Sequence, residues 1–338
     1  MTSKELVIRT LDFSSPLRVP RQLWFLPWAG DHYPEELARI QKRFPDDLIT
    51  SPSFYREPLK TAGDEYSPGT YIDEWGCRFE NKQKGVIGEV KEPLLKDWRD
   101  IDAVRIPSER LSLDSKKVNE FCRSHSQFVL SRSCARPFEQ LQFIRAPENL
   151  YLDLADQPSE LIRLLGRIHR FYCEEMELWA RTEADALVFS DDWGGQNSLL
   201  ISPALWRKMF RPLYQDYVDI AHGRGKYIFM HSDGWIMDII PDLIEIGVDA
   251  LNAQLFCMDI EELGRRFKGK MTFWGEIDRQ YLLSYGTTGE VRTAVKRVKE
   301  SLYHQDGGII AQCEFGAGAR PENVAAVFLA WEELQASP

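Results

Sequence analysis

The sequence has no long apolar run of the kind that a membrane helix needs. No stretch of about 18 uncharged apolar residues occurs among its 338 residues. The N-terminal segment MTSKELVIRTLDF has an acidic residue on either side of a short apolar stretch, so it does not resemble a signal peptide. Positive charge is also in deficit, because 42 Lys and Arg face 52 Asp and Glu, for a formal net charge of −10. This balance argues against nucleic acid or an anionic membrane as a partner.

Cysteine pairs with metal-site spacing are missing as well. The six cysteines are scattered without a CxxC motif. In a chain of this length they are expected to be reduced thiols of a cytoplasmic protein, not a disulfide framework. The apolar content of 43% is enough to build a sizeable core.

The chain contains no low-complexity segment, short repeat or flexible linker, which favours one domain over residues 1–338. Residues 1–120 are irregular and rich in proline and aromatic residues, and are expected to hold the first strands. Residues 121–338 alternate short apolar runs with amphipathic helical stretches, a pattern typical of βα units.

The apolar runs predict parallel strands covered by helices. The expected strands are Gln22–Leu26, Phe128–Ser131, Ala186–Ser190, Tyr227–Met230, Ala250–Asn252, Met271–Trp274 and Gly308–Ala311. A closed barrel and an open doubly wound sheet both fit this series. Because no glycine-rich dinucleotide fingerprint follows any strand, the sequence favours an α/β fold of the (β/α)8 TIM-barrel type with an irregular N-terminal extension.

Polar residues follow five successive strands, at the ends where barrel enzymes place their catalytic groups. These residues are Asp191 and Asp192, His231 and Asp233, Gln254, Glu276, and Cys313. Their convergence predicts an active site at this end of the barrel.

Each residue also has a structural alternative. Asp191 and Asp192 could cap a loop or helix, and His231 could be a hydrogen-bonded histidine at the barrel rim. Cys313 could be a small buried hydrophobic residue, and Glu276 a member of an ion pair.

At these positions the sequence resembles the uroporphyrinogen decarboxylase superfamily, over residues 185–330. The similarity lies in the segments SDDWGGQNSLLISPALWRKMFRPLY, KYIFMHSDGWIMDIIPDLIEIGVDALNAQ, MTFWGEID and GGIIAQCEFGAGARPENVAAV. The resemblance implies a distorted (β/α)8 barrel, in agreement with the strand pattern.

Within the superfamily, the chain resembles the corrinoid-dependent methyltransferases more than the true decarboxylases. The decarboxylases bind their substrate through an arginine-rich N-terminal segment, whereas here residues 24–30 read WFLPWAG. Their late histidine is replaced in the segment Ala311–Glu314. Without these basic groups, a substrate with many carboxylates loses its electrostatic anchor.

The methyltransferase branch binds zinc through a His-x-Cys pair and a distant cysteine. The resemblance therefore implies zinc ligands at His231, Asp233 and Cys313, with Asp233 standing where that branch has cysteine. Aspartate is a competent zinc ligand, and a harder ligand set favours an oxygen-containing substrate. Glu276 could add a ligand or orient one.

The other candidate residues are expected to act on the substrate or to bind it. Asp191 or Asp192 would orient it or donate a proton. Trp24, Trp28, Gln254 and Trp274 are expected to line its pocket, although aromatic residues here could also only pack the barrel mouth.

The function favoured by the sequence is a metal-dependent methyltransferase that moves a methyl group between a small methylated substrate or a thiol and a corrinoid. Since the chain carries no DxHxxG-like corrinoid signature, the cobalamin would reside on a separate carrier protein or dock over the barrel mouth as free cobalamin. The alternatives are a metal-free decarboxylase or lyase acting on a carboxylated substrate, and a non-catalytic corrinoid- or tetrapyrrole-binding protein. Homodimers are common in the family and are the expected assembly if the chain is not a monomer.

Overall fold

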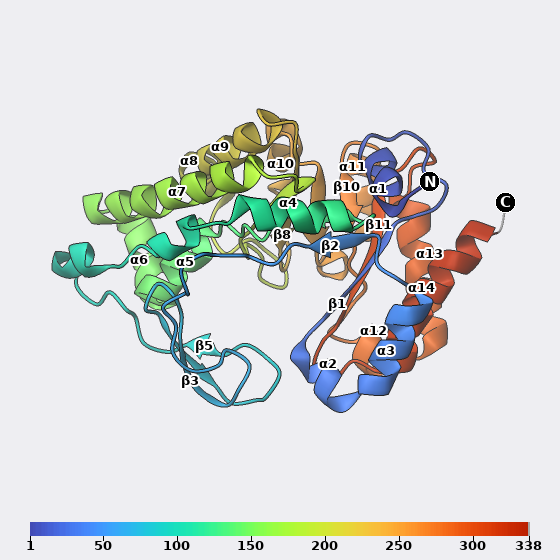
Figure 1. Ribbon diagram of the computed structural model, residues 1–338, viewed down its shortest axis with the longest axis horizontal. Coiled ribbons are helices and arrows are strands. Elements are labelled where there is room, and N and C mark those ends of the chain that lie inside the picture. Colours follow the sequence, from blue (N-terminus) through green and yellow to red (C-terminus); the bar gives the residue numbers. More distant parts are fainter. Residues whose placement is uncertain (337–338) are drawn as a thin grey trace.

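Eight parallel strands form a nearly closed barrel in the computed structural model, which describes residues 1–336 (Figure 1). The strands are β1 (Arg21–Phe25), β2 (Leu48–Thr50), β6 (Phe128–Leu130), β7 (Ala186–Ser190), β8 (Tyr227–Ser232), β9 (Ala250–Ala253), β10 (Thr272–Trp274) and β11 (Ile309–Phe315). They follow one another around the sheet in chain order, and β11 pairs with β1. The TIM-type α/β fold expected from the sequence is confirmed.

The barrel has one seam, between β1 and β2. Within residues 1–336, no strand ladder joins these two neighbours. The seam is bridged by the Asp47 N–H, which donates to the Arg21 carbonyl at 2.9 Å, and by the Gln22 amide, which donates to the Leu48 carbonyl at 3.2 Å. The Asp46 carboxylate accepts the Leu23 N–H at 2.8 Å. One backbone hydrogen bond and two side-chain contacts thus close the seam in place of a strand ladder.

Helices surround the barrel, with α7, α8 and α9 on one side and α13 and α14 on the other (Figure 1). Their bounds are α1 (Ser3–Leu11), α2 (Pro27–His32), α3 (Pro34–Arg43), α4 (Ser115–Ser124), α5 (Pro137–Arg145), α6 (Pro147–Asp156), α7 (Ser159–Ala180), α8 (Pro203–Met209), α9 (Arg211–His222), α10 (Ile240–Ile246), α11 (Ile260–Phe267), α12 (Leu282–Tyr285), α13 (Thr288–Leu302) and α14 (Pro321–Ala336). Short 3-10 turns lie at Trp98–Ala103, Ser108–Leu111 and Leu255–Cys257. Helices α8 and α9 are separate because Pro212 in the first turn of α9 has no N–H to continue the preceding helix.

Helix α1 closes the end of the barrel opposite to the polar strand ends. Its Val7 and Leu11 pack with Leu48, Phe128 and Ile310 in a buried cluster inside the barrel. A second, larger cluster lies between the strands and the outer helices. The open end, away from α1, is therefore where a ligand can enter.

The N-terminal part also holds a small antiparallel sheet that the sequence pattern did not predict. It comprises β3 (Gly69–Ile72), β4 (Arg78–Asn81) and β5 (Glu89–Val90) and lies at the lower edge of Figure 1. Its strands are only two to four residues long, too short for a clear alternation of polar and apolar residues.

Within residues 1–336, no helix is both long enough and apolar enough to cross a bilayer.

Candidate metal centre and substrate cavity

The loops after β7 and β8 touch each other at two glycines. The Gly194 N–H donates to the Asp233 carbonyl at 3.0 Å, and a Cβ on Gly234 would overlap the Gly194 carbonyl. Gly234 also has a positive φ of 78°, which a side chain would disfavour. Because only glycine allows this close approach, the segments SDDWGG and HSDGW bring Asp192 and Asp233 to either side of His231.

His231, Asp192 and Asp233 form a compact group of potential metal ligands. Nε2 of His231 lies 3.5 Å from Oδ1 of Asp192 and 3.6 Å from Oδ1 of Asp233. One ligand atom from each residue lies within 4.8 Å of the other two. The Asp192 carboxylate also accepts the Asp233 N–H at 2.8 Å, which fixes the two loops relative to each other.

The histidine ring is held by a partner on the neighbouring strand. Nδ1 of His231 lies 2.6 Å from Oδ1 of Asn252, whose amide nitrogen donates to the Trp274 carbonyl. This chain of contacts assigns the amide oxygen of Asn252 to the ring, so Nδ1 carries the proton. The lone pair of Nε2 therefore points to Asp192 and Asp233, as in metal sites where the second ring nitrogen is fixed by a hydrogen bond.

A positive charge at Nε2 is favoured electrostatically. Burial lowers the pKa of His231, but the carboxylates of Asp192 and Asp233 outweigh it, so the net shift of this pKa is upward. The two carboxylates can be neutralised there either by a proton on His231 or by a cation bound between the three side chains.

The geometry fits a zinc ion. Zinc–nitrogen and zinc–oxygen bonds of about 2.0–2.1 Å in a tetrahedron place ligand atoms about 3.3–3.4 Å apart, close to the 3.5 and 3.6 Å found here. Oδ1 of Asp233 is buried and has no hydrogen-bond partner within residues 1–336. A buried carboxylate oxygen without a partner is costly, and a metal ion would satisfy it.

Arg279 provides a permanent positive charge beside Asp233. Its guanidinium pairs with Oδ2 of Asp233, and lies 3.5 Å from Glu276 and 3.4 Å from Glu314. Burial raises the pKa of Glu276 to about 8, although Arg279 lowers it, so this carboxyl is protonated at neutral pH. Burial also raises the pKa of Glu314. Glu276, for which the sequence pattern predicts a catalytic role, lies on the Arg279 side of the group.

The structure does not bring Cys313 to His231. In β11, Ile310 faces the barrel interior, whereas Cys313 lies in the core between the strands and the helices. Strand alternation therefore turns the neighbouring Glu314 toward the site. Burial raises the pKa of the Cys313 thiol well above its usual range, which disfavours the thiolate that would bind zinc.

Asp191 is fully buried behind the group. Its carboxylate accepts the backbone N–H groups of Phe138 and Glu139 at 3.1 and 2.8 Å, at the start of α5. The Tyr214 hydroxyl donates to the same carboxylate at 2.6 Å. These contacts are those of a capping residue that ties α5 to β7, the structural alternative considered for this residue.

A cavity of about 370 Å³ opens beside His231 at the barrel mouth. Trp24 and Trp274 line it, and the Trp24 ring centroid is 5.5 Å from that of His231. Both indole N–H groups donate to Oε1 of Gln22, at 3.1 and 3.0 Å. Since Gln22 satisfies their polar atoms, the two rings are fixed with carbon surface toward the cavity.

Two residues expected to bind substrate lie elsewhere. Trp28, in α2, stacks on His32 with ring centroids 4.2 Å apart and is not among the residues that line this cavity. Gln254 accepts the Gly234 N–H at 3.0 Å and lines a separate cavity of about 120 Å³ together with Glu276 and Arg279. The site thus has a larger cavity beside His231 and a smaller one beside Glu276.

Several site residues were missed from the sequence, among them Asn252, which holds the His231 ring. Arg279 follows Glu276 by three residues, and Glu314 adjoins Cys313. Arg136 lies in the polar segment after Phe128–Ser131, and this strand end carries the same signal as the five that were considered.

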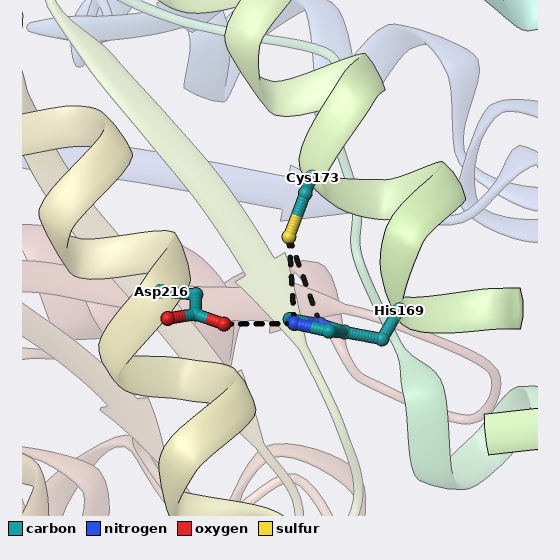
Figure 2. A group of neighbouring side chains, drawn as sticks. All are labelled: His169, Cys173 and Asp216. Atoms are coloured by element: carbon teal, nitrogen blue, oxygen red, sulfur yellow. Dashed lines mark hydrogen bonds and ion pairs between the residues drawn. The ribbon is translucent and has the colours of Figure 1, made fainter. Parts of the chain in front are cut away.

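A second group of potential ligands lies on the outer helices, where His169 and Cys173 of α7 meet Asp216 of α9 (Figure 2). Nε2 of His169 is already 2.9 Å from the Asp216 carboxylate. Sγ of Cys173 is 3.7 and 3.6 Å from the two ring nitrogens, so it is aligned with neither lone pair. Burial raises the pKa of this thiol to about 12. The group at His231 is the better metal site.

The fold and site define a barrel protein with a polar centre at the carboxyl ends of its strands. The family model for uroporphyrinogen decarboxylase (URO-D) matches residues 70–334. The chain belongs to this family.

A solved structure with a similar fold is a methyltransferase from Methanosarcina mazei, at 14% identity, with 99% of each chain covered and a TM-score of 0.72. A xylanase from Gloeophyllum trabeum is more distant, at 11% identity, with 95% of this chain and 98% of that chain covered and a TM-score of 0.45. A comparison with curated proteins found no match.

Proposed function

We propose that the protein is a zinc-dependent methyltransferase that transfers a methyl group from a small methylated substrate to a corrinoid. The observation that supports it most directly is the group of His231, Asp192 and Asp233 at the barrel mouth, with the partnerless Oδ1 of Asp233 aimed at Nε2 of His231. The proposed ligand set keeps His231 and Asp233 from the expected one and takes Asp192 in place of Cys313.

A zinc ion held there would act as a Lewis acid on the oxygen or sulfur atom that carries the methyl group. Asn252 would keep the His231 ring in the orientation that frees Nε2, and Arg279 would fix Asp233 through its other oxygen. Trp24 and Trp274 would hold the apolar part of the substrate and exclude water from the cavity.

The transfer needs a nucleophilic acceptor. When a methyl ether is the donor, its methyl carbon–oxygen bond would break, and a cobalt(I) corrinoid would supply the nucleophile that accepts the methyl group. The bonding electron pair stays with the oxygen, which then takes up a proton. Because the chain shows no corrinoid signature, a carrier protein would present the cofactor over the barrel mouth.

The test is methylation of cob(I)alamin by the zinc-loaded protein with methyl ethers and methyl thioethers as donors. Methylcobalamin should form with the wild type, and the His231→Ala variant should lose this activity. Cys313→Ala is the control and should retain it. Methylation by His231→Ala at the wild-type rate would refute the proposal.

A metal-free carboxy-lyase is the second candidate, because Glu276 with a pKa of about 8 is a proton donor at neutral pH. In such a reaction a carbon–carbon bond breaks, carbon dioxide leaves, and the electron pair left on carbon takes the proton of Glu276. Release of carbon dioxide that persists after chelation of metal would favour this function.

A further inference from the structure

Arginine side chains line one part of the cavity beside His231. Arg110, Arg132 and Arg136 all contribute to its wall, together with the two tryptophans. They come from the Ser108–Leu111 turn and from the segment between β6 and α5. A cavity with three guanidinium groups attracts anions, so the pairing state of each one decides what it can bind.

The Arg110 guanidinium is fully paired with carboxylates. Its Nε and Nη2 each donate to the carboxylate of Glu175 at 2.8 Å, and its Nη1 donates to Glu74 at 3.0 Å. The Glu175 side chain is fully buried and that of Arg110 is 8% exposed. This is a structural ion pair with no charge left for a ligand.

Arg136 and Arg132 are not paired in this way. Within residues 1–336, neither guanidinium makes a hydrogen bond or an ion pair of 4.0 Å or less. The Arg136 guanidinium lies only over the ring of Phe143, at 5.2 Å. Burial lowers the pKa of Arg136, but Glu139 and other neighbours raise it further, so the group stays charged without a direct partner. The Arg136 side chain is half-buried in the cavity wall, whereas that of Arg132 is exposed. A half-buried, unpaired guanidinium is suited to bind a carboxylate or sulfonate with two hydrogen bonds.

The rest of the cavity defines the rest of the ligand. Trp24 and Trp274 present carbon surface, since Gln22 accepts both of their N–H groups. A volume of about 370 Å³ lies at the small end of ligand pockets. These walls match a small molecule with one apolar part and one anionic end.

We propose that Arg136, assisted by Arg132, binds an oxyanion group of the substrate, a carboxylate or sulfonate, while its apolar part packs on Trp24 and Trp274. The inference rests on the proposed function in taking this cavity as the substrate site. The basic anchor lacking in residues 24–30 is thus supplied from another part of the barrel mouth.

The experiment is calorimetric titration of the full-length, chelator-treated protein with para-methoxybenzoate, para-methoxybenzenesulfonate and methoxybenzene. Removing metal prevents the anions from binding to it directly. At least one anion should bind about ten- to a hundredfold more tightly than the neutral ether, and added salt should weaken only the anion. The anion with the larger gain in affinity over methoxybenzene shows whether the site prefers a carboxylate or a sulfonate.

Variants assign the preference to Arg136. Arg136→Gln should reduce the affinity for the anion to that for methoxybenzene, and Arg136→Lys should restore part of it. Arg99→Gln removes an exposed arginine that does not line this cavity and should leave all affinities unchanged. Circular dichroism and thermal unfolding establish that each variant folds, and the salt dependence of the wild type tests the proposal without any variant.

Three results would overturn the inference. They are equal affinity of the wild type for the anions and the neutral ether, no binding of either anion, and an unchanged anion preference in a folded Arg136→Gln protein. If the preference holds while cob(I)alamin methylation fails, the oxyanion site stands and the methyltransferase proposal falls.

Discussion

Oδ1 of Asp233 lies 3.6 Å from Nε2 of His231, is buried, and has no hydrogen-bond partner within residues 1–336. The other oxygen of the same carboxylate pairs with Arg279. Asp233 thus joins a permanently charged guanidinium to a histidine nitrogen that can accept a cation. The proposed metal site depends on this arrangement, and so do the predictions below.

Asn252 is expected to set the metal affinity by orienting His231. Asn252→Ala removes the acceptor that fixes Nδ1 and should weaken zinc binding about ten- to a hundredfold, as measured by competition with a chromogenic chelator. Asn252→Asp keeps an acceptor at the same position and should bind zinc nearly as well as the wild type. Wild-type affinity in Asn252→Ala would mean that the ring needs no such support.

The contact between the β7 and β8 loops is expected to tolerate no side chain at Gly234. Gly234→Ala combines a positive φ with overlap on Gly194, and should cost about 2–4 kcal/mol of unfolding free energy and weaken zinc binding. Gly225 has a similar φ of 65° but open space around it, so Gly225→Ala isolates the backbone cost. The free energy of unfolding of this control should fall by only about 1 kcal/mol, and its zinc affinity should stay unchanged. Equal effects in denaturant titrations of the two variants would contradict the proposed role of the contact.

Asp191 is expected to act on stability and not on metal binding. Asp191→Ala leaves two N–H groups at the start of α5 and the buried Tyr214 hydroxyl without their acceptor. The unfolding free energy should fall by roughly 2–4 kcal/mol, while the zinc content of the folded protein stays unchanged. Loss of zinc from a protein that remains folded would show that Asp191 belongs to the metal site.

Asp46 is expected to make stability depend on pH. Burial is the main cause that raises its pKa to about 7. The folded state therefore holds this proton more tightly than the unfolded state, and the associated stability is lost as pH rises from about 4 to about 7. Asp46→Asn keeps an acceptor for the Leu23 N–H and removes the titration. Denaturant titrations across this range should show the wild type losing roughly 1–3 kcal/mol relative to the variant as pH increases. Parallel pH profiles would contradict the raised pKa.

The sequence predicted the barrel because its later strands are separated by long patterned helices. It also singled out His231, Asp192 and Asp233, which the structure brings close together, because each lies at or just after the end of a predicted strand. Both results depend on local patterns that hold in any barrel of this kind.

The site residues that the sequence did not reveal depend on strand length and on contacts between loops, which local patterns do not encode. The expected strand ended at Ala311, whereas β11 continues to Phe315 and places Cys313 and Glu314 on opposite faces. Because residues 309–313 are all buried, hydrophobicity does not indicate which of them face the barrel interior and which face the outer helices. The contact between Arg279 and Asp233 joins residues 46 positions apart, and their two loops carry no shared sequence signal.

The most direct test of the metal centre is the metal content of the purified protein, measured by mass spectrometry for the wild type, His231→Ala and Cys313→Ala. The account predicts about one zinc per chain in the wild type, loss of zinc in His231→Ala, and retention in Cys313→Ala. A wild-type protein that takes up no zinc, or equal loss of zinc in both variants, would contradict it.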